Sequence, residues 1–234
     1  MSIDKKELKY SSGNVLNNKV HEIGIISLGS HRENHGSCLP IDTDSKIASN
    51  VALKVATETG ATYLGIFYGA TEYNYVQHGI HLDKEELIYK QIIPQLINAK
   101  KLLGLTSVII VNGHGGNNRI IPDIPIIEEK TGLKIILNNS IIENEGPHAC
   151  TGELSMGKVL GITDEDKLKE HGNFKKNPEV GMVGLSLARK NEPIINNEAK
   201  FIEKNGFEID EKFGKSLLEN AKKSIIKDIK KLTN

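Results

Sequence analysis

Short runs of β-branched and aliphatic residues alternate with longer amphipathic segments along this chain. The short runs predict strands at residues 22–28, 62–68, 107–112 and 134–138, and the longer segments predict helices at residues 45–59, 84–103, 119–130 and 211–232. Pro94 should kink the second of these helices, because proline has no amide hydrogen to donate. Strands that alternate with helices are typical of a parallel sheet covered on both faces. The sequence therefore predicts an α/β fold with three layers, α/β/α, around a mainly parallel central sheet.

The composition narrows the class of protein further. A length of 234 residues, of which 38% are hydrophobic, suits one folded domain over residues 1–234. Basic and acidic residues number 30 each, so the formal net charge is zero and no nucleic-acid partner is expected. No apolar run approaches the ~20 residues of a membrane span, so no membrane contact is expected. Residues 1–14 lack the apolar stretch of a secretory signal, and two cysteines cannot form a disulfide framework, so we expect a cytoplasmic protein.

Residues 161–206 show little apolar periodicity and are rich in Asn, Lys and Gly. This pattern favours long surface loops with a little helix. Such a segment is expected to serve as a lid or as a contact between subunits.

The loop after the first predicted strand carries acids and histidines at close spacing. Glu33 and His35 are two residues apart, so their side chains point the same way in an extended segment, and Asp44 follows just before a helix. Together they offer the oxygen and nitrogen ligands that bind Zn²⁺, Fe²⁺ or Mn²⁺. The alternative is a polar loop in which Asp42 or Asp44 caps the helix.

A second candidate loop, NGHGGN at residues 112–117, follows the third predicted strand and places His114 among three glycines. It partly resembles a phosphate-binding loop, but Asn118 stands where that fingerprint has another glycine. In a parallel sheet, loops at the carboxyl ends of the strands meet at one edge. We therefore expect His114 to share a metal with Glu33, His35 and Asp44.

A third cluster follows the fourth predicted strand. His148 and Glu153 are candidates for general acid–base catalysis, and Glu153 is also a candidate metal ligand. The alternative for Glu153 is that it favours the amino end of a short helix that begins near Thr151. Cys38 and Cys150 lie in these loops but lack the spacing of a thiolate site, so they are interpreted as packing residues.

The remaining histidines receive weaker interpretations. His78 and His81 lie in the loop after the second predicted strand, where they either face a substrate or serve as buried polar groups. His31 lies beside the Glu33–His35 pair and outside it, and His21 and His171 are interpreted as ordinary surface or loop residues. The lysines of residues 222–231 are expected to form the solvated face of the last helix.

The motifs ENHGSCLPIDTD (residues 33–44) and NGHGGN (residues 112–117), taken together, resemble those of the creatininase family of binuclear metal amidohydrolases. The resemblance extends over about residues 23–155. It implies an α/β/α fold, two divalent metal ions and hydrolysis of a non-peptide C–N amide bond. By that pattern Glu33 and His114 would bind one metal, His35 the other, and Asp44 would bridge them.

The chain also departs from the family pattern. Creatininase carries a carboxylate two positions after the motif histidine, where this chain has Gly116; Glu153 is the expected replacement. In the family's His-Ala-Gly-Glu-x-Glu segment, one acid has become Thr151. Creatininase closes its pocket with tryptophan, which this chain lacks, so creatinine is not the expected substrate.

Within the family, the motif details are most similar to archaeal enzymes that remove formate from a formylaminopyrimidine nucleotide during riboflavin and deazaflavin-coenzyme biosynthesis. This likeness implies a small nucleotide-like substrate, Fe²⁺ in first place with Zn²⁺ or Mn²⁺ as alternatives, and a homo-oligomer. In the implied reaction, His148 would donate a proton to the departing amine. The alternatives are a hydrolase of another small amide or peptide, and a non-catalytic metal-binding module.

Overall fold

A four-stranded parallel sheet forms the centre of the protein. The computed structural model describes residues 15–17 and 19–233; residues 1–14, on which the expectation of no secretory signal rests, lie outside the described part. The strands are β1 (Ile23–Leu28), β2 (Thr62–Ile66), β3 (Ser107–Asn112) and β4 (Lys134–Asn138), in the order β2-β1-β3-β4. All neighbouring pairs are parallel, so the predicted sheet is confirmed.

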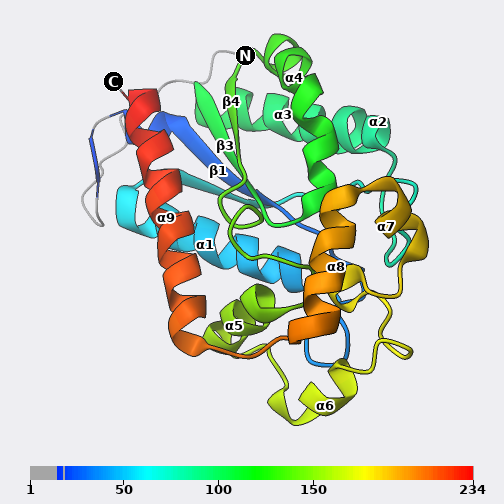
Figure 1. Ribbon diagram of the computed structural model, residues 1–234. Helices are drawn as coiled ribbons and strands as arrows, with labels where there is room; N and C mark the ends of the chain where they lie inside the picture. The colour runs from blue at the N-terminus through cyan, green and yellow to red at the C-terminus, as the bar shows by residue number, and fades with distance from the viewer. Residues whose placement is uncertain (1–14, 18, 234) are drawn as a thin grey trace.

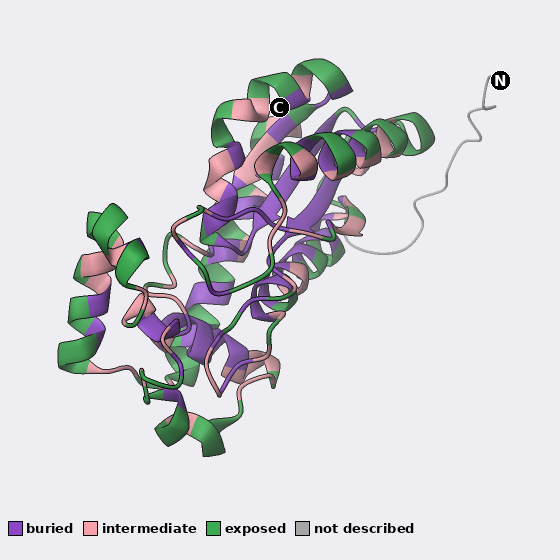
Figure 2. Cartoon of the chain, turned by 90° about the vertical axis from the view of Figure 1, so that its right-hand side faces the viewer, coloured by how far each residue is buried: buried purple, intermediate pink, exposed green. Residues whose placement is uncertain are grey.

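Helices cover both faces of the sheet, which gives the predicted three layers (Figure 1). On β1, Ile23 and Ile25 point into a core with α1 (Thr43–Thr59), α5 (Thr151–Leu160) and α9 (Glu211–Thr233). The alternate residues Ile26 and Leu28 point into the opposite core, beneath α3 (Ile93–Leu103) and α4 (Ile124–Thr131). Figure 2 shows the buried strands between helices whose outer faces are exposed. Every residue of the central strands β1 and β3 is buried, which explains why these two strands are mainly apolar rather than alternating.

The helices that lead into strands end in the same way. α1, α3 and α4 terminate at Gly60, Gly104 and Gly132, each with a positive φ of 82°, 68° and 62°. Only glycine adopts this left-handed conformation without steric cost, and it lets the chain turn sharply into the next strand. The amino-terminal edge of the sheet is thus built from tight turns.

The carboxyl-terminal edge carries the longer loops. β1 lies between β2 and β3, so the connections leaving β1 and β3 diverge to opposite sides of the sheet. Leu28 and Asn112, the last residues of these two strands, are in register. Ligands in open α/β sheets bind at such a switch point. The loops that contain Glu33 and His114 both begin there.

Two predicted helices are subdivided. The helix expected at residues 84–103 consists of α2 (Lys84–Glu86), a π-helical segment η2 (Leu87–Ile92) and α3. The irregularity ends just before Pro94, which cannot donate to the carbonyl four residues earlier. The helix expected at residues 119–130 begins as a 3₁₀ segment, η3 (Gly115–Asp123), and continues as α4.

The expectation of mainly loops at residues 161–206 is wrong. This stretch forms η4 (Glu165–Lys167), α6 (Leu168–His171), η5 (Val180–Met182), α7 (Ser186–Asn191) and α8 (Pro193–Asn205). In α8 only Ala199 and Ile202 are buried, so the apolar stripe is narrow and the abundant Asn and Lys obscure it in the sequence. The segment packs through Val180 and Ile202 against Ala149 and Cys150, beside the third candidate cluster.

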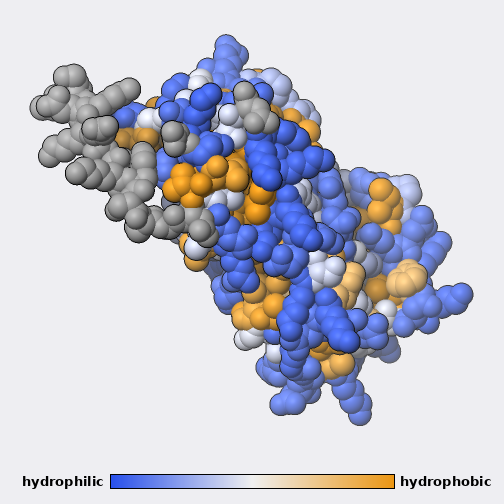
Figure 3. Space-filling view, turned by 90° about the vertical axis from the view of Figure 1, so that its left-hand side faces the viewer, coloured by the Kyte–Doolittle hydropathy of each residue, from blue (hydrophilic) through white to orange (hydrophobic). Residues whose placement is uncertain are grey.

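The surface near α9 is hydrophilic. Figure 3 views the molecule from the side where α9 lies, and hydrophilic side chains predominate there. Lys223, Lys227, Lys230 and Lys231 are exposed, so this part of the lysine-rich face of α9 is solvated as expected. Lys222 is partly buried and pairs with Glu58 at 2.8 Å. Within the described residues, no helix is both long and apolar enough to cross a membrane.

A short 3₁₀ turn, η1 (Val20–Glu22), leads into β1.

Candidate metal centre

The structure brings Glu33, His35, Asp44 and His114 together at the carboxyl-terminal edge of the sheet. His114 Nδ1 lies 3.0 Å from both Glu33 Oε2 and Asp44 Oδ2. His35 Nε2 lies 2.9 Å from the other oxygen of Asp44, Oδ1. Asp44 therefore stands between the two imidazoles, with one carboxylate oxygen toward each. All four side chains are buried.

Asp44 is free for this position because it does not cap α1. The helix begins at Thr43, and Asp42, the residue before it, makes no capping hydrogen bond through its side chain. Asp42 instead pairs with Lys46 at 2.6 Å on the surface. The carboxylate of Asp44, in the first helical turn, turns inward.

Two imidazoles are held in the tautomer that suits a metal ligand. His35 Nδ1 donates to the backbone carbonyl of Glu33 at 3.0 Å, so the lone pair of Nε2 faces Asp44. His148 Nε2 donates to the carbonyl of Asn34 at 2.9 Å, so the lone pair of its Nδ1 faces the cluster. Donation of one ring N–H to a backbone carbonyl is how proteins orient metal-binding histidines. A lone pair aimed at a carboxylate needs a proton or a cation between them.

Glu153 and His148 form the far side of the centre. Glu153 lies in the first turn of α5, and its Oε2 accepts the N–H of Ala149 at 2.8 Å and lies 3.8 Å from His35 Nε2. His148 Nδ1 lies 3.8 Å from Glu33 Oε1 and 3.9 Å from Glu153 Oε1. Ala149, between them, has a φ of 53°, which is unusual for a residue other than glycine. This strained turn holds His148 and Glu153 toward the same point.

The surroundings of His148 and Glu153 shift their pKa values in opposite directions. Burial, reinforced by the neighbouring charges of His35 and His78, lowers the pKa of His148 to about 3, so this imidazole is neutral. Burial raises the pKa of Glu153 to about 7; His35 opposes this effect, and Asp44 and Glu33 add to it. Burial also raises the pKa of Glu145, together with the charges of Glu153 and Asp44.

For Glu33, His35 and His114, the neighbouring charges outweigh the effect of burial on the pKa. Burial alone would raise the pKa of Glu33, but His114 and other nearby imidazoles outweigh it, and the pKa lies well below its ordinary value. Burial alone would lower the pKa of His35 and of His114, but Asp44 and Glu33 raise both well above the ordinary value. The cluster thus stabilises positive charge strongly.

The residues present fit a bound divalent metal. Both carboxylate oxygens of Glu33 and Nε2 of His114 are buried without a hydrogen-bond partner, although charged neighbours lie close to them. Four groups of three side chains place their donor atoms within 4.8 Å of one another; they are Glu33–His81–His114, Glu33–His78–His148, His35–His148–Glu153 and Glu33–His35–Asp44. Mixed carboxylate and imidazole donors suit Fe²⁺, Zn²⁺ and Mn²⁺.

The sequence left the roles of His78 and His81 open, and the structure places both beside Glu33. His78 Nε2 lies 2.5 Å from Glu33 Oε1, and His81 Nε2 lies 3.6 Å from Glu33 Oε2. Their only signal in the sequence was two imidazoles, three residues apart, in a loop at the correct sheet edge. Nothing in that spacing connects them to Glu33.

A further carboxylate occupies the space above Gly116. A Cβ at this position would lie 2.6 Å from Glu72 Oε1, 2.5 Å from the Thr71 carbonyl and 2.7 Å from His114 Nε2. Glu72 Oε2 lies 3.5 Å from His114 Nε2, the nitrogen that faces away from Asp44. Glu153 was the expected replacement for the missing acid at Gly116; Glu72 is the acid that lies directly beside it.

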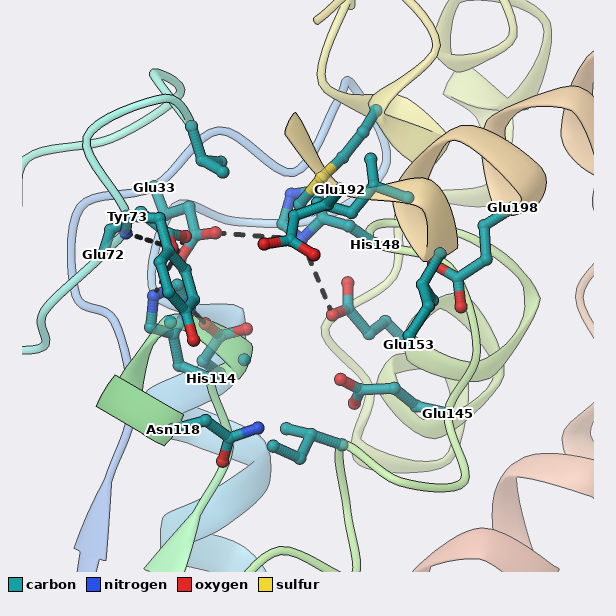
Figure 4. A pocket seen from close by; sticks show the side chains of 18 of the residues that line it. Glu33, Glu72, Tyr73, His114, Asn118, Glu145, His148, Glu153, Glu192 and Glu198 are labelled. Atoms are coloured by element: carbon teal, nitrogen blue, oxygen red, sulfur yellow. Dashed lines mark hydrogen bonds and ion pairs between the residues drawn. The ribbon is translucent and has the colours of Figure 1, made fainter. Parts of the chain in front are cut away.

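A cavity of about 320 Å³ opens onto the centre (Figure 4). Seven acidic side chains line it: Glu33, Asp44, Glu72, Glu145, Glu153, Glu192 and Glu198. No lysine or arginine of the described residues lines it. Glu192 and Glu198 come from the region of α8, where loops were expected from the sequence. This concentration of negative charge favours cations within the cavity.

His171 and the two cysteines are all buried near the site loops. His171 is not an ordinary surface or loop residue as expected: it is fully buried, accepts the N–H of Cys38 at 3.1 Å and donates to the Ala149 carbonyl at 2.8 Å, and so ties two site loops together. Cys38 and Cys150 are buried in separate apolar clusters. Burial raises the pKa of both thiols, for Cys38 to about 11, which agrees with packing roles.

Comparison with known proteins identifies relatives along the whole chain. A family profile described as "Creatininase: Creatinine amidohydrolase" matches residues 14–161. A protein of Methanosphaera stadtmanae, named 2-amino-5-formylamino-6-ribosylaminopyrimidin-4(3H)-one 5'-monophosphate deformylase, is 71% identical over 99% of this chain and 100% of its own length. A protein of the same name from Methanothermus fervidus is 49% identical over 97% of this chain and 92% of its own length.

Solved structures of creatininase share the fold. A point mutant of creatininase in its Zn-Zn form has a TM-score of 0.62 at 16% identity and covers 89% of this chain and 90% of its own. The manganese form of creatininase has a TM-score of 0.60 at 19% identity, with the same coverage of both chains. At such low identity these structures establish the architecture alone.

Proposed function

The chain belongs to the creatininase family, and on this premise we propose that it is a metal-dependent amidohydrolase that removes formate from 2-amino-5-formylamino-6-ribosylaminopyrimidin-4(3H)-one 5'-monophosphate. The observation that carries the proposal is the 71% identity, over essentially the full length of both chains, to a relative named for this reaction. The buried cluster of carboxylates and imidazoles supports it, since hydrolysis of an amide needs an activated water. We further propose that residues 1–234 act as one domain in archaeal riboflavin and deazaflavin-coenzyme biosynthesis.

Two divalent ions, Fe²⁺ in first place and Zn²⁺ or Mn²⁺ as alternatives, are the proposed cofactors. Glu33 and His114 would hold one ion and His35, with Glu153, the other, while Asp44 offers an oxygen to each side. Bound there, such ions would supply an activated water at neutral pH and an electrophile for the formyl oxygen.

His148 is proposed to move the proton. It is neutral, its Nε2 is committed to the Asn34 carbonyl, and its Nδ1 faces the cavity. It therefore accepts the proton that the attacking water releases before it donates one. As the water oxygen bonds to the formyl carbon and the C–N bond breaks, Nδ1 passes this proton to the departing nitrogen, which becomes the free 5-amino group on the pyrimidine ring, and formate leaves. Glu153 Oε1, 3.9 Å from Nδ1, has a pKa of about 7 and assists this transfer.

Substrate comparison with metal removal tests this function. The purified protein is assayed for formate release from the formylaminopyrimidine nucleotide, and for turnover of creatinine and of small peptides. We expect release from the nucleotide alone, loss of activity on chelation, and recovery when Fe²⁺ is restored without oxygen. Full activity after chelation, or preferential turnover of creatinine or a peptide, would reject the proposal.

The exposed surface and the cysteines bear on assembly and location. Large apolar side chains on α7 and α8 are exposed, among them Ile194 at 70% and Phe201 at 58%. We propose that they contribute to a homo-oligomer, which light scattering of the purified protein would reveal. The free, buried cysteines Cys38 and Cys150 suit the reducing cytoplasm that we propose as its location.

A further inference from the structure

A short stretch of the loop after β2 pairs with the loop after β1. The backbone N–H of Asn34 donates to the His78 carbonyl at 2.8 Å, and the N–H of Ile80 donates to the Arg32 carbonyl at 2.8 Å. Between these bonds, Glu33 and Gly79 form an antiparallel bridge. The pairing fixes residues 78–81 relative to Glu33 through the backbone.

Gly79 makes this close approach possible. A Cβ there would lie 2.8 Å from the Arg32 carbonyl, 3.1 Å from the Glu33 Cα and 2.6 Å from His81 Cε1. Only glycine leaves room for both the backbone of Arg32 and Glu33 and the His81 ring. The sequence His-Gly-Ile-His is therefore suited to place an imidazole on each side of Glu33.

The two imidazoles engage different oxygens of Glu33. His78 Nε2 lies against Oε1, whereas His81 Nε2 and His114 Nδ1 both approach Oε2, at 3.6 and 3.0 Å. The rings of His81 and His114 stack, with centroids 5.0 Å apart and planes inclined by 12°. Apart from Glu33, His81 Nε2 has a long contact of 3.3 Å to Ser30 Oγ.

We propose that His81 is a metal ligand, which completes with Glu33 and His114 a set of two imidazoles and one carboxylate. The donor atoms of these three residues lie within 4.8 Å of one another and come from three separate segments of the chain. Asp44 Oδ2, 3.0 Å from His114 Nδ1, adds a fourth donor on the same side. His78 holds the other oxygen of Glu33 and so keeps Oε2 turned toward this position.

The assignment has a consequence for the choice of metal. With Asp44 as the fourth donor, this position offers two imidazole nitrogens and two carboxylate oxygens. Imidazole suits Fe²⁺ and Zn²⁺ better than Mn²⁺, so the second imidazole, from His81, favours Fe²⁺ or Zn²⁺ over Mn²⁺ at this position. The inference rests on the proposed metal centre, whereas the identity of the substrate does not enter it.

Substitution by cysteine gives a direct test, because a thiolate bound to Co²⁺ produces a strong charge-transfer absorption in the near ultraviolet. The metal-free His81→Cys variant is titrated with Co²⁺ in the presence of a phosphine reductant. We expect this absorption from His81→Cys and none from the unaltered protein, whose Cys38 and Cys150 are buried in apolar clusters. His78→Cys, on the other side of Glu33, is the matched variant.

The outcomes separate clearly. A folded His81→Cys protein without the absorption overturns the assignment, and so does absorption from His78→Cys alone. If His81→Cys fails to fold, as judged by thermal melting, His81→Ala is titrated with Co²⁺ instead. Its dissociation constant should rise by at least the ~10–100-fold typical of lost supporting residues, and an unchanged constant overturns the assignment. His31→Ala, outside the donor groups, is the control.

The proposed reaction can fail independently of this inference. If the unaltered protein releases formate while His81→Cys shows no absorption, only the role of His81 is wrong. If the absorption is present and the unaltered protein releases no formate, only the proposed substrate is wrong.

Discussion

The carboxylate of Glu72 fills the space that a side chain at Gly116 would need, since a Cβ there would lie 2.6 Å from Glu72 Oε1. Glu72 is held in this place by its neighbours. Its Oε1 accepts the N–H of Tyr73 at 2.6 Å, and its backbone carbonyl accepts a hydrogen bond from Arg119, which also donates to Thr71 Oγ1 at 3.1 Å. A carboxylate thus lies beside position 116 in this chain, although it comes from the loop after β2.

Glu72→Gln should weaken metal binding through His114. The carboxylate lies 3.5 Å from His114 Nε2 and favours a proton on that nitrogen, which leaves the Nδ1 lone pair directed at Glu33 and Asp44. Loss of such a supporting carboxylate typically costs ~10–100-fold in metal affinity. Calorimetric titration of the metal-free protein measures the change.

Gly116→Ala should have a similar effect, because its Cβ would displace Glu72 from His114 or push against His114 Nε2 itself. Gly115→Ala is the matched control, because a Cβ at Gly115 meets no atom within 4 Å. Equal metal affinity in Gly116→Ala and Gly115→Ala would show that Glu72 does not support His114.

His148→Ala should lower kcat by ~10²–10⁴-fold, the usual contribution of a group that transfers protons. Metal content should stay the same, because Glu33, His35, Asp44 and His114 remain. Formate release and metal analysis on the same sample separate these two effects. An unchanged kcat would remove the proposed role of His148, and a loss of metal would instead make it a ligand.

Glu153→Gln should change how stability depends on pH in the metal-free protein. Burial raises the pKa of Glu153 from 4.5 to about 7 in the folded state, so the folded protein binds this proton more tightly than the unfolded chain does. The resulting stability is fully present below pH 4.5 and is lost as pH rises toward 7. The loss for one such group is about 1–3 kcal/mol.

Glutamine cannot ionise, so the variant should gain in free energy of unfolding relative to the unaltered protein between about pH 5 and about pH 8. Urea unfolding with a chelator present measures this difference. Glu129→Gln, an exposed position on α4, is the control. Parallel stability curves for Glu153→Gln and the unaltered protein would contradict the raised pKa.

Tyr75→Phe should weaken substrate binding without slowing the chemistry. The Tyr75 hydroxyl donates to Glu192 Oε1 at 2.5 Å and so connects the loop after β2 to the cavity wall beside α8. A hydrogen bond of ~0.5–1.5 kcal/mol corresponds to a rise in KM of about 2–10-fold. Steady-state kinetics, with Tyr63→Phe on β2 as the control, would reveal this; a lower kcat at unchanged KM would disagree.

The sequence predicted the sheet and its candidate metal-binding edge because both depend on local signals. β3 and β4 have the predicted bounds, since their apolar runs are uninterrupted and both faces are covered. Glu33 and His114 could be connected by topology alone, because parallel strands place their following loops at one edge.

The roles of His81, Glu72 and α8 could not be predicted in the same way. His81 reaches Glu33 only because two backbone hydrogen bonds pair its loop with residues 32–34, and this pairing has no periodic signal. Glu72 is recognisable as a partner of His114 only once the space above Gly116 is known. In α8, two buried residues were too few to outweigh the polar composition.

The left-handed glycines that end α1, α3 and α4 make one rim of the sheet a series of short, near-identical turns, whereas every candidate donor lies at the other rim. Scaffold and chemistry therefore occupy opposite ends of the same strands. Substitutions in the turns can therefore change the stability of the protein without touching the candidate donors. Substitutions in the loops at the opposite edge can change the substrate while the sheet stays the same.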